Sequence, residues 1–326
     1  MQKLCLANLP TPLFHHPGLD ALVGAEVWVK RDDMTAGAET GNKLRKLEYL
    51  LAQAHERGAT CVITCGGLQS NHCRATTLAA RQVGLRCQLL LRGPLPDHEP
   101  ATGNWLLDRM AGAEIRLITA QEYRQRDALM ADVARELTTA GEVPYIIPEG
   151  GSNGLGALGY VDAMAEIATQ LKRGECGTVS HFDTVAVACG SGGTAAGLAL
   201  GAAAFNVASD IWALPVCEDA AYFERRIAVI MAEARALRPG LTSHGTVPVR
   251  VHDQFRGPAY GVASPEQLQF MIEVAQTCGL VLDPSYTGKA LYGVAQLNRK
   301  PGRICFIHTG GCPGLLGTPD ALAPYL

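Results

Sequence analysis

The stretch DTVAVACGSGGTAAGLALGAA, residues 183–203, contains the pattern that decides the fold. Its apolar run predicts a buried strand, the glycine-rich turn predicts a sharp change of direction, and the alanine-rich run predicts a helix. Glycines let successive N–H groups converge at the positive end of the helix dipole, where a phosphate binds well. The turn lacks the Lys-Ser/Thr pair of a Walker loop and the spacing of a dinucleotide fingerprint. A tight turn without a ligand is the alternative; Ser191 and Thr194 within the turn favour phosphate.

The same alternation of apolar runs and helical patterns extends outward along almost the whole chain. The other runs are EVWVKRD (26–32), TCVITCG (60–66), CQLLLRG (87–93), EIRLIT (114–119), PYIIPEG (144–150), IWALPVC (211–217) and RICFIHTGG (303–311). This alternation predicts an α/β fold, with parallel sheets covered by helices on both faces. Ligands of such sheets bind at the carboxyl ends of the strands.

The length and composition narrow the class of protein. The 326 residues suggest two domains, and because no linker is visible we expect the domains to be interwoven. A net charge of −3 and 48% hydrophobic residues exclude disorder and give no reason to expect nucleic acid or a membrane as partner. The 11 cysteines have neither disulfide nor zinc spacing, so we expect free thiols, no metal and a cytoplasmic location. Residues 92–104 and 238–260 are expected to be connections, the first entering a helix at Trp105 and the second functional because of its length.

Lys43 is the first candidate for chemistry. The pattern is helical from Asn42, so Lys43 is expected in the first turn, where the helix dipole opposes a cation and favours a neutral amine. A neutral lysine amine is what a Schiff base requires. The alternative is a solvated lysine in a charged helix start.

Two further groups of residues stand beside glycines at the edges of predicted elements. Ser70 and Asn71 follow a Gly-Gly turn; they could cap the next helix or hold a carboxylate at its N-terminus. His72 could act as a base or be structural. Tyr260 and Tyr286 could act as acids or bases, or simply pack with their hydroxyls hydrogen-bonded.

Taken together, the chain resembles the D-cysteine desulfhydrase and 1-aminocyclopropane-1-carboxylate deaminase family of pyridoxal-phosphate enzymes. The strings that carry the resemblance stand in the family's order: KRDD and GNKLRKLEYL (30–50), TCGGLQSNHCR (64–74), TGNWLLDR (102–109), PEGGSNGLGALGY (148–160), CGSGGTAAGL (189–198), AYGV (259–262), LDPSYTGKALYG (282–293) and IHTGG (307–311). The resemblance implies the tryptophan synthase β-subunit fold and a homodimer. It implies a large cofactor-binding domain of residues 1–44 and 155–326, a small domain of residues 45–154, and an active site between them.

The resemblance also implies roles for individual residues. Lys43 is expected to form the Schiff base with pyridoxal 5'-phosphate, and Asn71 to meet the hydroxyl of its ring. Ser70 is expected to clamp the substrate carboxylate, and Tyr260 and Tyr286 correspond to the family's two active-site phenols. The expected phosphate ligands are Lys46, Gly190, Ser191, Gly192, Gly193 and Thr194. The expected substrate-binding residues are Gln69, Ser70, Asn71 and His72.

Two departures bear on the activity. The deaminase branch has an acidic residue after the second tyrosine, where this chain has Thr287, and Thr309 is the better-placed contact for the ring nitrogen. A hydroxyl leaves that nitrogen closer to neutral than a carboxylate does, which disfavours opening a cyclopropane more than expelling a thiolate. The second departure is Cys189 in the glycine loop together with the bulky Trp105, which could change phosphate binding or pocket size.

The resemblance therefore implies β-elimination of D-cysteine to pyruvate, sulfide and ammonia. Three alternatives stay open: cyclopropane deaminase activity, a lyase acting on another small β-substituted amino acid such as L-cysteate, and a pyridoxal-phosphate-binding protein without turnover. Retention of Lys43, Ser70 and both tyrosines argues against the last, because binding alone needs neither phenol.

Overall fold

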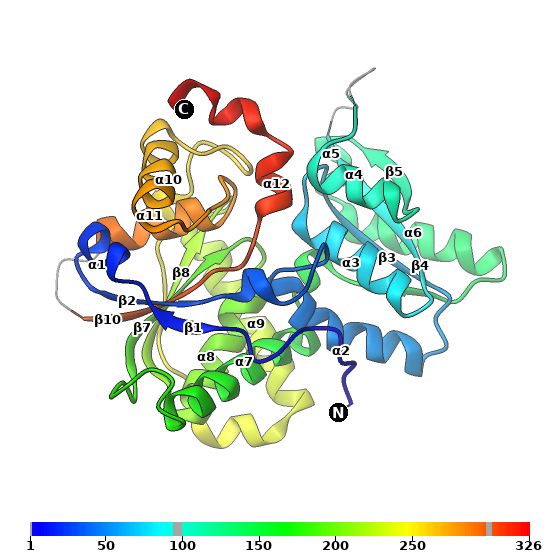
Figure 1. The fold of residues 1–326 in the computed structure, drawn as a ribbon. Coiled ribbons are helices and arrows are strands. Elements are labelled where there is room, and N and C mark those ends of the chain that lie inside the picture. The colour runs from blue at the N-terminus through cyan, green and yellow to red at the C-terminus, as the bar shows by residue number, and fades with distance from the viewer. Residues whose placement is uncertain (1, 94–99, 298–301) are drawn as a thin grey trace.

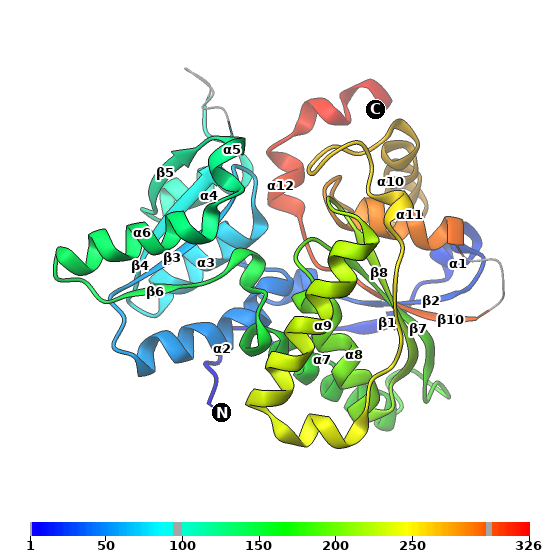
Figure 2. The same cartoon turned by 180° about the vertical axis from the view of Figure 1, so that it is seen from behind.

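The computed structural model describes residues 2–93, 100–297 and 302–326, and its strands form two sheets. The six-stranded sheet has the order β1-β2-β10-β7-β8-β9, and the four-stranded sheet has the order β5-β4-β3-β6. All neighbouring strands are parallel except β1 and β2. Figures 1 and 2 show the sheets in two lobes, seen from opposite sides. The strands are Leu13–His15 (β1), Glu26–Lys30 (β2), Cys61–Gly67 (β3), Arg86–Arg92 (β4), Glu114–Ile118 (β5), Pro144–Ile146 (β6), Phe182–Cys189 (β7), Ala208–Pro215 (β8), Val249–Val251 (β9) and Arg303–Ile307 (β10).

Every run that the sequence predicts as a strand forms one, so the α/β class with parallel sheets is confirmed. The strands β1 and β9, of 3 residues each, were not predicted. The expected connection 238–260 contains β9 and two short 3-10 helices. Part of the other expected connection, residues 94–99, lies outside the described residues, and its helix begins at Gly103, two positions before Trp105.

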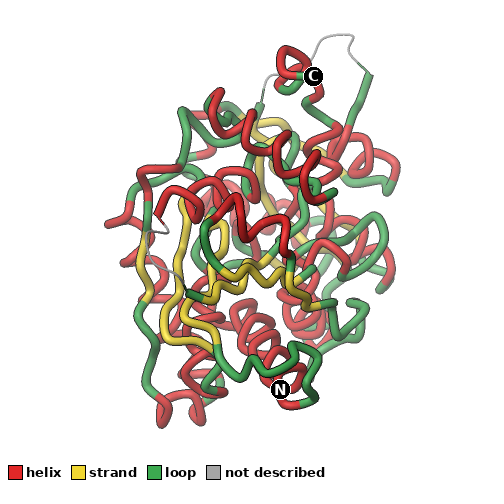
Figure 3. Tube along the Cα trace, turned by 60° about the vertical axis from the view of Figure 1, so that its left-hand side comes forward, coloured by secondary structure: helices red, strands yellow, loops and turns green. Residues whose placement is uncertain are grey.

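Helices cover both faces of each sheet, and Figure 3 shows the strands enclosed between them. Alternate residues of β7 show the division: Val185 and Val187 pack with α7, α8 and α9, whereas Ala186 and Ala188 pack with α1, α10 and α11. The α-helices are Pro17–Val23 (α1), Asn42–Glu56 (α2), Asn71–Gln82 (α3), Gly103–Met110 (α4), Ala120–Tyr123 (α5), Arg126–Thr139 (α6), Gly154–Lys172 (α7), Gly193–Phe205 (α8), Ala220–Leu237 (α9), Pro265–Cys278 (α10), Thr287–Leu297 (α11) and Cys312–Leu316 (α12). The 3-10 helices are Asp32–Met34 (η1), Glu149–Gly151 (η2), Pro239–His244 (η3), Asp253–Phe255 (η4), Pro319–Ala321 (η5) and Ala323–Tyr325 (η6). Within the described ranges, none of these helices combines the length and hydrophobicity needed to cross a bilayer.

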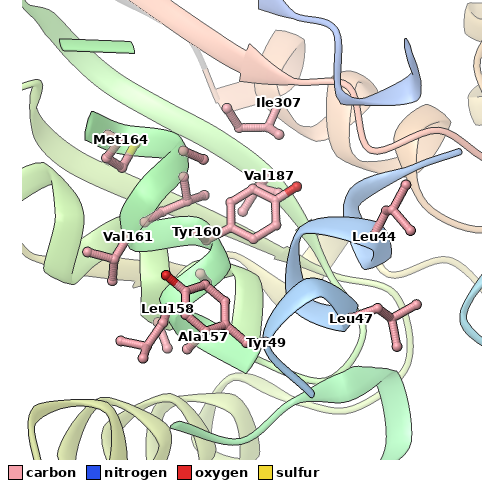
Figure 4. Packing of buried hydrophobic residues seen from close by; sticks show 14 of the residues in the cluster. Leu44, Leu47, Tyr49, Ala157, Leu158, Tyr160, Val161, Met164, Val187 and Ile307 are labelled. Atoms are coloured by element: carbon pink, nitrogen blue, oxygen red, sulfur yellow. The ribbon is translucent and has the colours of Figure 1, made fainter. Parts of the chain in front are cut away.

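The helix α2 joins the two lobes and packs closely on α7. Leu44 and Leu47 of α2 belong to the same buried cluster as Leu158 of α7 (Figure 4). A Cβ at Gly159 would lie 2.3 Å from the carbonyl oxygen of Arg45, so only glycine permits this approach of the two helices. The position of the start of α2, which carries Lys43, is therefore fixed by the core.

The smaller sheet is built by one uninterrupted segment of the chain. All four of its strands lie between residues 61 and 146, after α2 and before α7, whereas the larger sheet takes strands from both sides of this segment. The chain passes between the lobes along α2 and returns through η2. Both passages lie close to the glycine loop that follows β7.

Candidate active site

Two cavities lie near the carboxyl ends of two strands: β3, in the smaller sheet, and β7, in the larger sheet. The small cavity, of about 20 Å³, is lined by the turn after β7 and by residues of four other segments. The large cavity, of about 330 Å³, extends from there to the turn after β3 and to α5. Four residues line both cavities: Lys43, Gly190, Ser191 and Tyr286. The small cavity is also lined by Asn42, Asn71, Cys189, Gly192, Thr194 and Thr309, and the large one by Ser70, His72, Arg92, Tyr123, Glu149 and Tyr260.

The turn after β7 has the geometry of a phosphate site. Gly192 has a φ of 86°, in the left-handed region that favours glycine, and α8 begins at the next residue. The amide of Gly193 points at Ser152 Oγ at 3.3 Å, and Ser152 Oγ lies 2.7 Å from Ser191 Oγ. A Cβ at Gly193 would lie 2.6 Å from Ser152 Oγ, so a side chain there would fill the site.

Lys46 supplies the charge at this turn. Its amine donates to Ser152 Oγ at 3.0 Å and to the carbonyl of Gly150 at 3.2 Å, and no carboxylate lies within ion-pair distance among the described residues. Burial, together with the neighbouring Lys43 amine, holds the pKa of Lys46 well below its usual value. A buried amine with hydroxyls and a helix N-terminus but no counter-ion fits a dianionic phosphate, which would restore its charge.

Lys43 lies in the first turn of α2, as the sequence predicts. The amide of Asn42 donates to the carbonyl of Thr309 at 3.1 Å, which ties the start of α2 to the loop after β10. Burial lowers the pKa of Lys43 to about 8, against the opposing pull of Glu149. A substantial fraction of the amine is therefore neutral near pH 8, and it faces both cavities.

Ser70 caps α3 and also faces the large cavity. Its Oγ accepts from the amide of Cys73 at 3.2 Å, so the capping role weighed from the sequence is present. A Cβ at Gly66 would lie 2.5 Å from Ser70 Oγ; the glycine makes room for the hydroxyl. The two roles coexist because an N-cap hydroxyl stands at the anion-binding end of its helix.

His72 is buried and neutral. Thr64 Oγ1 donates its one proton to the carbonyl of Ile147 at 2.8 Å, so His72 Nε2, 2.8 Å away, must donate to Thr64. Burial and the amines of Lys43 and Lys46 hold the pKa of His72 well below its usual value. The ring therefore presents a fixed tautomer to the cavity.

The two tyrosines meet over the cavity. Their hydroxyls lie 2.8 Å apart, and the rings are edge to face with centroids 5.9 Å apart. A Cβ at Gly67 would lie 3.4 Å from Tyr260, and one at Gly190 would lie 2.9 Å from Tyr286. Each phenol thus covers one of the two glycine turns. Burial raises the pKa of both, so each keeps its proton at neutral pH.

Three residues singled out from the sequence lie away from both cavities. Gln69 does not line either cavity. Its side chain accepts from the backbone N–H of Asn104 at 2.9 Å and donates to the backbone carbonyl of Thr102 at 3.1 Å, and so it holds the start of α4. Thr287 also lies away from them, because its hydroxyl donates to Asp283 at 2.7 Å and accepts from the Asp283 amide at 2.8 Å. Trp105 packs within α4 with Arg109 over its ring and does not narrow either cavity. Cys189 does line the small cavity, and burial raises its pKa to about 12, so it is a neutral thiol.

Several cavity residues were missed by sequence reasoning. Arg92, at the carboxyl end of β4, lies with its guanidinium 4.7 Å from the ring centroid of Tyr123 and 5.8 Å from that of Tyr260. Tyr123 donates to Glu149 at 2.5 Å, and Arg126 pairs with the same carboxylate at 3.0 Å. The rule that ligands bind at the carboxyl ends of strands could have found Arg92. Ser152 stands in the quoted PEGGSN string, but its proximity to the β7 turn is a tertiary feature.

The comparisons with known proteins agree with this geometry. Residues 4–310 match the model of a family described as pyridoxal-phosphate dependent enzyme. The chain is 41% identical to the bifunctional D-cysteine desulfhydrase/1-aminocyclopropane-1-carboxylate deaminase, mitochondrial, of Arabidopsis thaliana, over 98% of this chain and 81% of that protein. It is 38% identical to the D-cysteine desulfhydrase of Salmonella schwarzengrund, over 96% of this chain and 95% of that protein.

A solved structure described as an ACC deaminase homologue superposes with a TM-score of 0.88 at 37% identity, covering all of this chain and 97% of the other. The structure of maize serine racemase, at 19% identity and a TM-score of 0.63, shares the fold. The resemblance carried by the quoted strings is thus confirmed. The chain belongs to the family of pyridoxal-phosphate-dependent enzymes, and its cofactor is pyridoxal 5'-phosphate.

Proposed function

We propose that the protein is a D-cysteine desulfhydrase: D-cysteine and water give pyruvate, hydrogen sulfide and ammonia. The observation that carries the proposal is the meeting of Lys43, Ser70 and the Tyr260–Tyr286 pair around one cavity. The names of relatives at 38–41% identity support the same reaction. Thr309 lines the small cavity and no carboxylate does among the described residues, which favours expulsion of a thiolate over opening of a cyclopropane.

The residues that would hold the cofactor are those of the phosphate site and the first turn of α2. Lys46, Ser152, Ser191 and the amide of Gly193 would bind the phosphate, and Lys43 would bind the carbonyl carbon. The other proposed phosphate ligands are Gly190, Gly192 and Thr194. When bound, pyridoxal phosphate supplies an electron sink for the bonding electrons of the substrate Cα–H bond.

The protein's own groups then divide the remaining work. Ser70 and Asn71 would hold the substrate carboxylate at the N-terminus of α3. Lys43, whose amine has a pKa of about 8, would take the Cα proton from the substrate. A neutral phenol of the tyrosine pair also lines the cavity, where it could give a proton to the leaving sulfur.

Cyclopropane deaminase activity is the second candidate. Relatives of Thermotoga maritima and Pyrococcus horikoshii, at 40% and 39% identity, are named putative 1-aminocyclopropane-1-carboxylate deaminases. Elimination from another small β-substituted amino acid, such as L-cysteate, uses the same residues. A binding protein without turnover would need neither phenol.

Three further proposals rest on the family resemblance. We propose a homodimer, a cytoplasmic location, and a division into a large domain of residues 1–44 and 155–326 and a small domain of residues 45–154. The separation of the two sheets at residues 61–146 supports the division.

The test is an assay of the purified holoenzyme with D-cysteine, measuring sulfide and pyruvate together. We expect both products in equal amounts, less with L-cysteine, and little 2-oxobutyrate from 1-aminocyclopropane-1-carboxylate. Lys43→Ala should abolish turnover and leave cofactor held only by the phosphate site, not fixed to the chain by borohydride. Holoenzyme that makes 2-oxobutyrate but neither sulfide nor pyruvate would establish the second candidate instead.

A further inference from the structure

We infer that Asn104, held by the buried guanidinium of Arg74, orients the side-chain amide of Asn71 so that Asn71 presents an N–H donor to the small cavity. Asn104 is a positioning residue that lines neither cavity. The inference depends on the cofactor and not on which amino acid is the substrate.

The hydrogen bonds around Asn104 can be satisfied in only one orientation. A guanidinium only donates, so the atom of Asn104 that lies 2.9 Å from Arg74 Nε must be its oxygen. The Asn104 amide nitrogen then lies 2.9 Å from the backbone carbonyl of Gln69, which only accepts. Both hydrogen bonds require the same orientation of the Asn104 side-chain amide, which is therefore fixed.

The orientation of the Asn104 side-chain amide determines that of the Asn71 side-chain amide. The Asn104 amide nitrogen also lies 2.9 Å from a terminal atom of Asn71, which must therefore be the Asn71 oxygen. The Asn71 NH₂ group remains for the small cavity, which Asn71 lines together with Lys43. The orientation of the Asn104 amide thus fixes that of the Asn71 amide. The orientation of Asn104 is itself fixed by Arg74, which can only donate hydrogen bonds.

Arg74 is suited to this role because its environment has only acceptors. It is 1% exposed, and it forms no salt bridge within the described residues. Its Nη1 donates to the carbonyls of Ala38 at 2.5 Å and Thr40 at 2.8 Å, in the segment that leads into α2. One guanidinium therefore connects the start of the helix that carries Lys43 with Asn104 and, through it, with Asn71.

A fixed donor at this point selects the protonation state of its ligand. A hydrogen bond to the charged form of a group favours that form. With its NH₂ toward the cavity, Asn71 favours an oxygen without a proton, such as the ring oxygen of pyridoxal phosphate in its anionic form. With its carbonyl toward the cavity, it would favour a protonated oxygen.

Asn104→Asp tests the inference with almost no change of shape. The carboxylate still accepts from Arg74 but cannot donate to Asn71, so the Asn71 amide should turn round and present its oxygen to the cavity. We expect the lysine-bound cofactor to lose visible absorption and gain near-ultraviolet absorption at constant pH. Cofactor affinity, measured by fluorescence titration of the apoprotein, should fall about 10- to 100-fold, as for loss of a hydrogen bond to a charged group.

The matched control is Asn206→Asp, the same chemical change at the exposed C-terminal end of α8. It should leave the spectrum and the cofactor affinity unchanged. A double-mutant cycle separates positioning from general damage: in an Asn71→Ala background, Asn104→Asp should have no further effect on either measurement. An unaltered spectrum in Asn104→Asp, or the same shift in the Asn71→Ala background, would overturn the inference.

If the buried carboxylate prevents folding, Asn104→Ala replaces it. This variant frees Asn71 to adopt either orientation, so the visible band should fall only part of the way. A visible band equal to that of the unchanged protein would contradict the inference for this variant as well.

Discussion

The hydroxyls of Tyr260 and Tyr286 lie 2.8 Å apart, and only one of them can donate to the other. The contact lowers the pKa of Tyr260 and raises that of Tyr286, although burial holds both above the usual value. We therefore expect Tyr260, the more acidic of the two phenols, to be the one that gives a proton in the cavity.

Replacing each phenol by phenylalanine tests this division. Tyr260→Phe should lower kcat by roughly 10²- to 10⁴-fold, because it removes the proton donor. Tyr286→Phe should lower kcat by about 10-fold, because it removes only the hydrogen bond that makes Tyr260 more acidic. Cofactor content should be unchanged in both, since the phosphate has its own site. Full activity of both variants would reduce the pair to packing residues.

Asp108 is a buried carboxyl whose pKa is shifted far from its usual value. It is fully buried, and its Oδ1 accepts from Thr77 Oγ1 at 2.8 Å; the same hydroxyl lies 3.0 Å from the carbonyl of Cys73. Burial raises the pKa of Asp108 to about 7, against the opposing effect of the Thr77 hydrogen bond.

Asp108→Asn should therefore stabilise the protein at alkaline pH. Between about pH 4 and pH 7 the unfolded carboxyl is ionised while the folded one keeps its proton, so a penalty accumulates that reaches at most about 4 kcal/mol above pH 7 and that asparagine does not carry. The gain in melting temperature should be largest near pH 8 and shrink as the pH falls toward 4, where both states are protonated. Asp320→Asn, at an exposed position, is the control and should show no such trend.

At the scale of elements, the loop that carries Tyr260 is fixed by α11. Lys289 is fully buried, and its amine donates to the carbonyls of Arg256 and Ala259, each at 2.7 Å. The end of the long connection 238–260 is thus held in place by hydrogen bonds from α11. Its position over the cavity depends on these two bonds.

Lys289→Met should release this loop. Two carbonyls lose the buried amine that donates to them, at a cost of about 0.5–1.5 kcal/mol each in the free energy of unfolding. We expect a lower melting temperature and a lower kcat, because Tyr260 loses its fixed position, while cofactor content is retained. Lys172→Met, at the exposed end of α7, is the matched control. If the variant is less stable but keeps its kcat, the position of the loop does not affect turnover and the prediction is wrong.

The elements also show what the sequence could predict. β-Branched or apolar runs, several of them ending in glycine or a polar residue, identified the strands, because a buried parallel strand leaves a strong local pattern. Gln69 and Thr287 lie away from the cavities because each bonds backbone groups at the start of a helix. Gln69 bonds Thr102 and Asn104 at the start of α4, which are distant in sequence, and Thr287 bonds Asp283 just before α11. Ser152 was missed because its position depends on how the two lobes meet. Lys46 came from the resemblance, since its isolation from carboxylates is visible only in three dimensions.

At the scale of the whole molecule, the buried thiols govern the response to alkali. Burial raises the pKa of Cys65, Cys87 and Cys189 to about 12, whereas an unfolded thiol ionises near pH 9. Above pH 9 the folded chain therefore binds more protons than the unfolded one, and stability is lost as the pH rises. Burial lowers the pKa of Lys30, Lys43, Lys46 and Lys289, and these amines act in the opposite direction up to about pH 10.5. They are outnumbered, because burial also raises the pKa of Cys73, Cys176, Cys217 and Cys305.

We expect the melting temperature to fall steeply between pH 9 and pH 11, each of these thiols contributing up to about 1.4 kcal/mol per pH unit. Calorimetry in reducing buffer measures this slope. Cys87→Ala should make the fall shallower, although it lowers the starting stability. Cys5→Ala, at an exposed position, should leave the slope as it is. A slope that is the same in both variants would contradict the assignment to buried thiols.

The uninterrupted origin of the smaller sheet has a consequence for how such enzymes diversify. Because the segment 61–146 is continuous and returns to the larger lobe through η2, whose Gly150 carbonyl accepts from Lys46, two crossovers between related genes would exchange it as a single piece. The exchanged piece carries Ser70 and Arg92, together with Asn71, Arg74 and Asn104, whereas Lys43, the glycine loop and both tyrosines stay with the recipient. Recombination can thus replace the wall that meets the incoming amino acid while the lysine and the phosphate site are inherited unchanged.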